Sequence, residues 1–199
     1  APTAVGAVGS LGAVIAAARP AARFAGDGEC PAYGFGKLVK DPDGLLDLPR
    51  GFQYRVFSEE NTRMSDGNPV PSSHDGMAAF PAPGGRTALI RNHELNPEDI
   101  AEDGLTPVRH LAGAVYDPDA LAGGTTTLLV GPDRRLISHR VSLAGTLDNC
   151  AGGPSPWGTW LSCEETLDTV GKPHGYVFEV DPVFGGNPVP IIPMGRFEH

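Results

Sequence analysis

Short apolar runs alternate with turn-forming residues along most of the chain. Three pairs of runs have the same form: 77–80 with 87–92, 125–130 with 136–143, and 176–180 with 189–192. In each pair a segment that contains proline separates the two runs, and this arrangement is typical of a β-hairpin. The pattern therefore predicts a protein built from antiparallel strands and tight turns.

The three predicted hairpins recur at a regular spacing. Their turn prolines are Pro81, Pro132 and Pro182, which lie 51 and 50 residues apart. A hairpin repeat of about 50 residues is the period expected for the blades of a β-propeller. We therefore expect an all-β fold, with about three blades of an incomplete or multi-part propeller in one domain over residues 26–199.

Composition supports short strands and limits the partners. Gly 27 and Pro 20 make up nearly a quarter of the 199 residues, which favours many turns over long helices. The formal net charge of −9 and the absence of a Lys/Arg stripe argue against nucleic acid. A chain this acidic needs metal ions or a few placed arginines to bind an anionic substrate.

Residues 1–25 have the composition of an export signal. The first eighteen residues carry no charge and consist mostly of Ala, Gly, Val, Leu and Ile. Small residues at 16–22 offer cleavage positions, so we expect a secreted or periplasmic protein. The alternative is a mobile Ala/Gly tail. A stable membrane span is not expected, because the run is short and rich in glycine.

A thiol and two carboxylates lie close together in the segment 143–166. Cys150 occupies a tight Asn-Cys-Ala-Gly-Gly-Pro turn, and Cys163 directly precedes Glu164 and Glu165. Thiol and carboxylate ligands together indicate a transition metal plus a harder cation. The alternative is a buried thiol and a solvated strand end. With Cys30 the chain has three cysteines, and a metal-bound thiolate would account for an unpaired one.

Each predicted returning strand runs into a loop with possible ligands. The first contains Glu94, the second contains Cys150, and the third ends in Glu198 and His199. Equivalent loops of successive propeller blades converge on the central channel, so we expect these side chains to share one site. The alternative is that Glu94, Glu198 and His199 are ordinary solvated loop residues.

Two further segments are weaker candidates. His74 and Asp75 could place an imidazole and a carboxylate beside the channel, although an Asx-turn also explains Asp75 before Gly76. The segment 41–44 resembles part of a calcium loop but lacks the distal glutamate, so we predict a turn there. No nucleophile elbow, phosphate-binding loop or H-E-x-x-H motif is present.

These segments resemble the PhoX-type alkaline phosphatases. The similarity is most specific in N-C-A-G-G-P-S-P-W-G-T-W-L-S-C-E-E at Asn149–Glu165, which is long and unusual. Five other segments fall in order over nearly all of the chain after residue 25: Asp41–Val56, His74–Phe80, Arg91–Glu94, Gly123–Thr127 and His174–Pro182.

The resemblance implies a twin-arginine-exported phosphomonoesterase on a β-propeller that uses Fe(III) and Ca²⁺ to hydrolyse small phosphate esters. The twin-arginine pair itself is absent from the leader-like residues 1–25. Carried onto the matching positions, the resemblance makes Cys150 the expected iron ligand. The other expected metal ligands are Glu94, Glu164 or Glu165, and the neighbourhood of Glu198 and His199. Alternation along a strand lets only one of Glu164 and Glu165 point inward, and we favour Glu165.

Two arginines beside these positions complete the predicted site. Arg91 and Arg196 are expected to bind phosphate oxygens, where charge develops in the transition state of phosphoryl transfer. The alternative is that both are exposed strand-end arginines. The metal ions would activate a bound water, and no protein nucleophile is required.

Chain length bears on whether such a site is complete. Six blades of about 50 residues need roughly 300 residues, whereas about 175 follow the leader-like segment. We therefore expect an N-terminal half that a second chain or a C-terminal half completes, and that can be inactive alone. The alternative functions are a non-catalytic extracellular metal-binding propeller and a calcium-dependent propeller esterase or lactonase. A soft thiolate has no use in a calcium-only site, and this favours the phosphatase.

Overall fold

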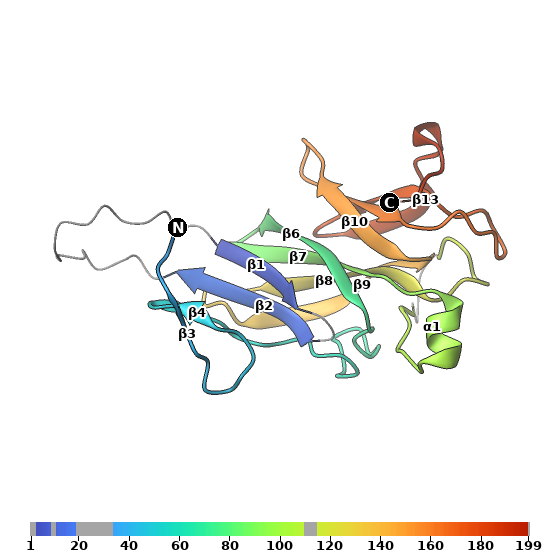
Figure 1. The fold of residues 1–199 in the computed structure, drawn as a ribbon. Coiled ribbons are helices and arrows are strands. Elements are labelled where there is room, and N and C mark those ends of the chain that lie inside the picture. The colour runs from blue at the N-terminus through green and yellow to red at the C-terminus, as the bar shows by residue number, and fades with distance from the viewer. Residues whose placement is uncertain (1–2, 9–10, 19–33, 110–114, 199) are drawn as a thin grey trace.

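The computed structural model describes residues 3–8, 11–18, 34–109 and 115–198, with side chains described from residue 34 onward (Figure 1). Two four-stranded antiparallel sheets form its centre, and in each of them consecutive strands are neighbours. The strands of the first sheet are β6 (His74–Ala82), β7 (Arg86–His93), β8 (Gly123–Val130) and β9 (Leu136–Thr146). Those of the second are β10 (Asn149–Pro154), β11 (Trp160–Glu164), β12 (Val177–Asp181) and β13 (Gly185–Pro190).

Smaller elements complete the described residues. A three-stranded sheet has the order β1-β2-β5, and β3 pairs with β4. Their bounds are β1 (Thr3–Val8), β2 (Leu11–Ala18), β3 (Leu38–Val39), β4 (Leu48–Pro49) and β5 (Phe52–Gln53). The helices are α1 (Pro97–Glu102) and the 3₁₀ turn η1 (Ile192–Met194). In the parts of the chain that the structure describes, no helix is long and apolar enough to cross a membrane.

The predicted all-β class and all three hairpins are confirmed. The hairpins are β6–β7, β8–β9 and β12–β13. The predicted repeat is different, because β7 pairs with β8 along its whole length and the first two hairpins therefore share one sheet. The described residues thus form two four-stranded sheets, without a closed propeller. Closure and about three blades stay predictions.

An apolar core fills the space between the two large sheets. Its buried side chains come from both of them: Phe80, Ile90, Leu143, Trp160, Phe178 and Val180. Each such side chain contributes about 1.5–3 kcal/mol when it is fully buried. In Figure 1 the orange-to-red strands β10–β13 accordingly lie against one end of the green-to-yellow strands β6–β9.

One polar side chain, that of Asn92, joins the sheets within this core. It is fully buried, and its amide nitrogen donates to the carbonyl oxygens of Cys150 at 3.0 Å and Ala151 at 2.9 Å. Its amide oxygen accepts from the Trp160 indole and the Ser162 hydroxyl, each at 2.9 Å. The indole can only donate, so the orientation of the amide is fixed. Asn92 therefore holds the start of β10 against β7.

The leader-like segment is described in part. The backbones of β1 and β2 form an antiparallel hairpin, and β2 also pairs with β5. Residues 19–33, which include Cys30, lie outside the described residues. Export and cleavage of this segment stay predictions.

We expect Asn92→Leu to destabilise the fold by about 3 kcal/mol, because the Trp160 indole and the Cys150 carbonyl would be left buried without a partner. Urea unfolding followed by tryptophan fluorescence measures this loss. Asn187→Ala, which changes an exposed asparagine of β13, is the control and should unfold like the wild type. Equal stability of both variants would contradict the role of Asn92.

Candidate functional site

Four segments that are distant in sequence meet where β7 and β11 end and β6 and β10 begin. Three backbone hydrogen bonds join them: Glu94 N–H to Ser73 at 3.0 Å, Asp148 N–H to Leu95 at 3.0 Å, and Glu165 N–H to Asp148 at 2.9 Å. Together these bonds fix the position of the chain around Cys150, the residue that Asn92 also holds.

Four carboxylates and a thiol gather at this junction. We call Asp75, Glu94, Asp148, Cys150 and Glu165 the acidic thiol cluster. Glu94 shares a hydrogen bond with Asp75 and interacts with the charges of Glu165 and Asp148. The thiol of Cys150 is hydrogen-bonded to the carboxylate of Glu165. Of the three loops predicted to converge, the first two, at Glu94 and Cys150, are therefore brought together, and Glu165 joins them.

The crowding of negative charge shifts the protonation of this cluster. Burial, the hydrogen bond with Asp75 and the neighbouring carboxylates raise the pKa of Glu94 to about 7. Burial and the hydrogen bond with Glu165 raise the pKa of the Cys150 thiol to about 12. Burial likewise raises the pKa of Asp148. A cation placed here would reverse these effects, because it stabilises carboxylate and thiolate together.

Backbone geometry explains why two of these residues stand where they do. Asp148 has a φ of 45°, a left-handed conformation that aspartate tolerates, and its carboxylate accepts from the Asn96 amide at 3.1 Å. A Cβ at Gly76 would lie 2.4 Å from the carbonyl oxygen of Cys150. Only glycine therefore lets β6 approach β10 closely enough to bring Asp75 to the cluster.

The donor types at the cluster fit the ions that the resemblance implies. Carboxylate oxygens suit a hard cation such as Ca²⁺, and thiolate sulfur suits a softer transition metal. Within residues 34–109 and 115–198, however, no group of three or more His, Cys, Asp or Glu side chains is arranged to hold a metal ion. The cluster thus contains suitable types of donor, but its described side chains are not arranged around one ion position.

The two adjacent glutamates at the end of β11 have different surroundings. Glu164 is fully buried and accepts from the backbone N–H groups of Leu147 at 2.9 Å, Gly175 at 2.8 Å and Tyr176 at 3.0 Å. Its fourth partner is His174 Nδ1 at 2.6 Å. These four hydrogen bonds use the acceptor capacity of a carboxylate. The structure therefore brings Glu165, and not Glu164, to Cys150, although the role of either as a ligand stays a prediction.

The Glu164 network extends to a second carboxylate. His174 is fully buried, and its Nε2 lies 3.3 Å from Asp117 Oδ2. Burial lowers the pKa of His174, but the hydrogen bonds and charges of Glu164 and Asp117 outweigh burial, so its pKa is raised overall. A buried imidazolium between two carboxylates compensates their charge, which marks this network as structural.

Arg91 is not placed beside Glu94. It is fully buried on the opposite face of β7, where it donates to the Thr126 hydroxyl at 3.2 Å and the Ser58 hydroxyl at 3.1 Å. Burial lowers its pKa to about 9. Its role as a phosphate-binding residue stays a prediction, and in this structure its guanidinium holds β7 and β8 to the segment around Ser58.

The last predicted residues lie near the end of the chain. Arg196 donates to the carbonyl oxygens of His174 at 2.5 Å and of Leu167 at 2.5 Å, so it ties down the loop before β12. Glu198 is exposed. His199 lies outside the described residues. The structure does not bring Arg196 to the acidic thiol cluster, and the predicted roles of these residues are untested.

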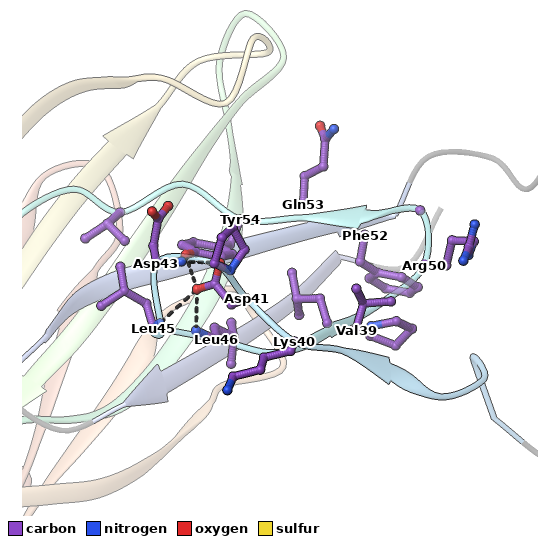
Figure 2. Close-up of a pocket in the computed structure, with 15 residues that line it drawn as sticks. Val39, Lys40, Asp41, Asp43, Leu45, Leu46, Arg50, Phe52, Gln53 and Tyr54 are labelled. Atoms are coloured by element: carbon purple, nitrogen blue, oxygen red, sulfur yellow. Dashed lines mark hydrogen bonds between the residues drawn. The ribbon is translucent and has the colours of Figure 1, made fainter.

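A pocket lined by residues 39–56 contains the segment that resembles part of a calcium loop (Figure 2). Asp41 accepts there from Tyr54 at 2.5 Å and from the backbone N–H groups of Leu45 at 2.8 Å and Leu46 at 3.1 Å. These bonds, with that of Tyr54 first, lower the pKa of Asp41 to about 2. The carboxylate thus holds its own loop, and the predicted turn is confirmed.

Comparison with known proteins gives one match. The model of a family described as "Alkaline phosphatase PhoX" matches residues 33–199. Neither the curated proteins nor the solved structures contain a match to this chain. The matched range includes both large sheets and every residue of the acidic thiol cluster.

We expect Glu164→Gln to lower the free energy of unfolding by about 3 kcal/mol, because the new amide NH₂ would face backbone N–H donors in a buried site. Glu165→Gln is the matched control one residue away, and its effect should stay within about 0.5 kcal/mol. Urea unfolding of both variants measures the difference. The division of roles between the two glutamates would be wrong if Glu165→Gln were the more damaging change.

We also expect a pH dependence from Glu94. Its pKa is raised from 4.5 to about 7 in the folded state, so the folded protein binds the proton more tightly than the unfolded chain. The free energy of unfolding should therefore fall as pH rises from about 4.5 to about 7. Glu94→Gln should flatten this slope, whereas Glu59→Gln, at an exposed position, should not. Unfolding curves across this range, recorded with a chelator, decide between the two outcomes.

Proposed function

The chain belongs to the PhoX family of alkaline phosphatases, and on this premise we propose that it hydrolyses small phosphate monoesters with iron and calcium ions bound at the acidic thiol cluster. A phosphatase-type function follows from the family. The choice of ions, the monoester substrate and the position of the site are our proposal.

The observation that carries the proposal is the meeting of Asp75, Glu94, Cys150 and Glu165 from four separate segments. Like charges placed this close destabilise a fold unless a positive charge balances them. Glu164 shows how the chain balances a buried carboxylate that is structural, with three backbone N–H groups and an imidazole. The acidic thiol cluster has no comparable cation among the side chains that the structure describes. The negative charge of the acidic thiol cluster, without a compensating side chain among those described, supports the proposal that a cation binds there.

Each residue would contribute in a specific way. Cys150 and Glu165 would hold the iron, and Glu94 and Asp75 would supply oxygen ligands to it or to calcium. Asn92 fixes the Cys150 carbonyl and so the direction of the thiol. Bound ions supply Lewis acidity toward the phosphate oxygens and activate a water molecule. Glu94 and Glu165 are both exposed, so solvent and a phosphate ester can reach them.

The location and assembly of the protein are part of the same proposal. We infer a secreted or periplasmic enzyme that is exported by the twin-arginine route, with residues 1–25 as part of the signal. Further ligands, including the positively charged groups that would bind phosphate, would come from the segment around Arg196, Glu198 and His199 and from a second chain or additional C-terminal residues. Ligands from these additional segments would explain why the described side chains of the cluster do not enclose an ion by themselves.

Two other functions use the same cluster. A metal-binding propeller without turnover would bind the ions but hydrolyse nothing. A calcium-dependent esterase or lactonase would need the carboxylates but not the thiol. The hydrogen bond between Cys150 and Glu165 favours the phosphatase over the latter, because it brings sulfur and carboxylate to one ion.

We expect the protein purified without chelator to contain iron and calcium and to hydrolyse p-nitrophenyl phosphate. Cys150→Ala should lose the iron and lower turnover by about 100-fold or more, because a first ligand is gone. Cys163→Ala removes the other described thiol and is the matched control, which should keep both metal and activity. Elemental analysis beside the turnover assay checks both variants.

The outcomes separate the three functions. Iron and calcium without turnover, even after a C-terminal half is added, would support the binding module. Turnover of carboxylic esters with calcium alone would support the esterase. Iron content unchanged in Cys150→Ala would contradict the proposed ligand directly.

A further inference from the structure

A cavity lies between the two large sheets, at the opposite end from the acidic thiol cluster. Its volume is about 150 Å³, and it is bounded by the β6–β7 turn, the middle of β8 and β9, and the β12–β13 turn. Arg86 begins β7, whereas Glu94 follows its end, and at about 3.3 Å per residue roughly 26 Å separate them along the strand. The cavity is therefore distinct from the proposed active site.

Two arginines and no carboxylate line this cavity. Arg86 donates through Nε to the carbonyl of Pro83 at 2.5 Å, and Arg140 donates through Nη2 to the carbonyl of Val183 at 2.5 Å. A guanidinium has five N–H donors, so these anchors leave most of each group for another partner. Neither arginine forms a salt bridge with a residue that the structure describes. The nearby Asp181 instead accepts from backbone N–H groups of its own turn.

A buried hydroxyl without a partner among the described residues belongs to a residue that lines the same cavity. Thr127 is 5% exposed and lines the cavity, and its Oγ1 has no hydrogen-bond partner among the described residues. Thr127 stands directly opposite Arg140 in the β8–β9 register, which places the two side chains on one face of the sheet. Buried hydroxyls are rarely left unpaired, because the missing hydrogen bond costs free energy. A ligand that reaches this hydroxyl from the cavity would supply the bond.

We propose that this inter-sheet arginine cavity binds a small tetrahedral oxyanion of the phosphate or sulfate class. Two guanidinium groups would offer charge-assisted hydrogen bonds, and the hydroxyls of Thr127 and Ser138 would complete a set of donors around the anion. An anion needs donors and no carboxylates, and the polar side chains that line this cavity include four possible donors and no carboxylate. The two arginines make this cavity positively charged, although the whole chain has a formal net charge of −9. This proposal does not rest on the proposed phosphatase function.

The test is a titration of the full chain with inorganic phosphate, followed by calorimetry and by the melting temperature in the presence of a chelator. We expect phosphate and sulfate both to bind and to raise the melting temperature. Arg140→Gln should weaken phosphate binding about 10- to 100-fold, and Thr127→Val about 3- to 10-fold. Without the anion, Thr127→Val should melt no lower than the wild type, because it removes an unpaired hydroxyl.

Arg135→Gln is the matched control, since it removes one positive charge from an exposed arginine of the neighbouring turn that pairs with Asp133. Its phosphate affinity should stay within about twofold of the wild type. Equal phosphate affinity in the wild type, Arg140→Gln and Thr127→Val would overturn the proposal. So would binding that survives in these variants but is lost in Cys150→Ala, because the anion would then bind at the acidic thiol cluster. Phosphate binding without any sulfate binding would overturn the assignment to a general oxyanion site.

Discussion

The four hydrogen bonds of Asn92 are the constraint on which the rest of this structure depends. The apolar core between the two large sheets brings them together, but apolar packing alone does not select one register of a sheet against its neighbour. The Asn92 carboxamide does so, because its two N–H groups and its oxygen each have a partner on β10 or β11. Any sliding of the sheets would leave several buried polar groups unpaired. The position of Cys150 therefore follows from the packing of the sheets.

Strand alternation directs neighbouring polar residues to opposite faces at two places. Along β7, Arg91 faces Ser58 and Thr126, while Asn92 faces the second sheet. At the end of β11, Glu164 faces His174 and three backbone N–H groups, while Glu165 faces Cys150. In both cases two polar neighbours in sequence serve opposite sides of a strand. On β7 both residues have protein partners for their hydrogen bonds, whereas at the end of β11 Glu164 is satisfied by protein and Glu165 reaches the acidic thiol cluster.

This division also explains what the sequence could predict. Proline-containing turns between apolar runs located all three hairpins, and the convergence of the loops at residues 94 and 150 was expected from the strand ends. The joining of β7 to β8 could not be predicted, because pairing between separate hairpins depends on long-range packing that a 50-residue spacing does not encode. The burial of Arg91 was missed for the same reason. Asp75 was ranked low, although Gly76, whose Cβ would strike the Cys150 carbonyl, marks the close approach that brings it to the cluster.

The acidic thiol cluster lowers the stability of the fold, because it places like charges close together without a compensating cation among the described side chains. Burial together with the neighbouring carboxylates raises the pKa of Glu94 to about 7 and that of Cys150 to about 12, so without a cation protonation of these groups is favoured. Metal binding must then displace protons, which couples affinity to pH and makes cation binding contribute to the stability of the junction. Without an ion, the segments are held in place by the backbone hydrogen bonds that Ser73, Leu95 and Asp148 accept. If the proposed ions bind there, the protein scaffold holds the donors near one another and the ions complete the site.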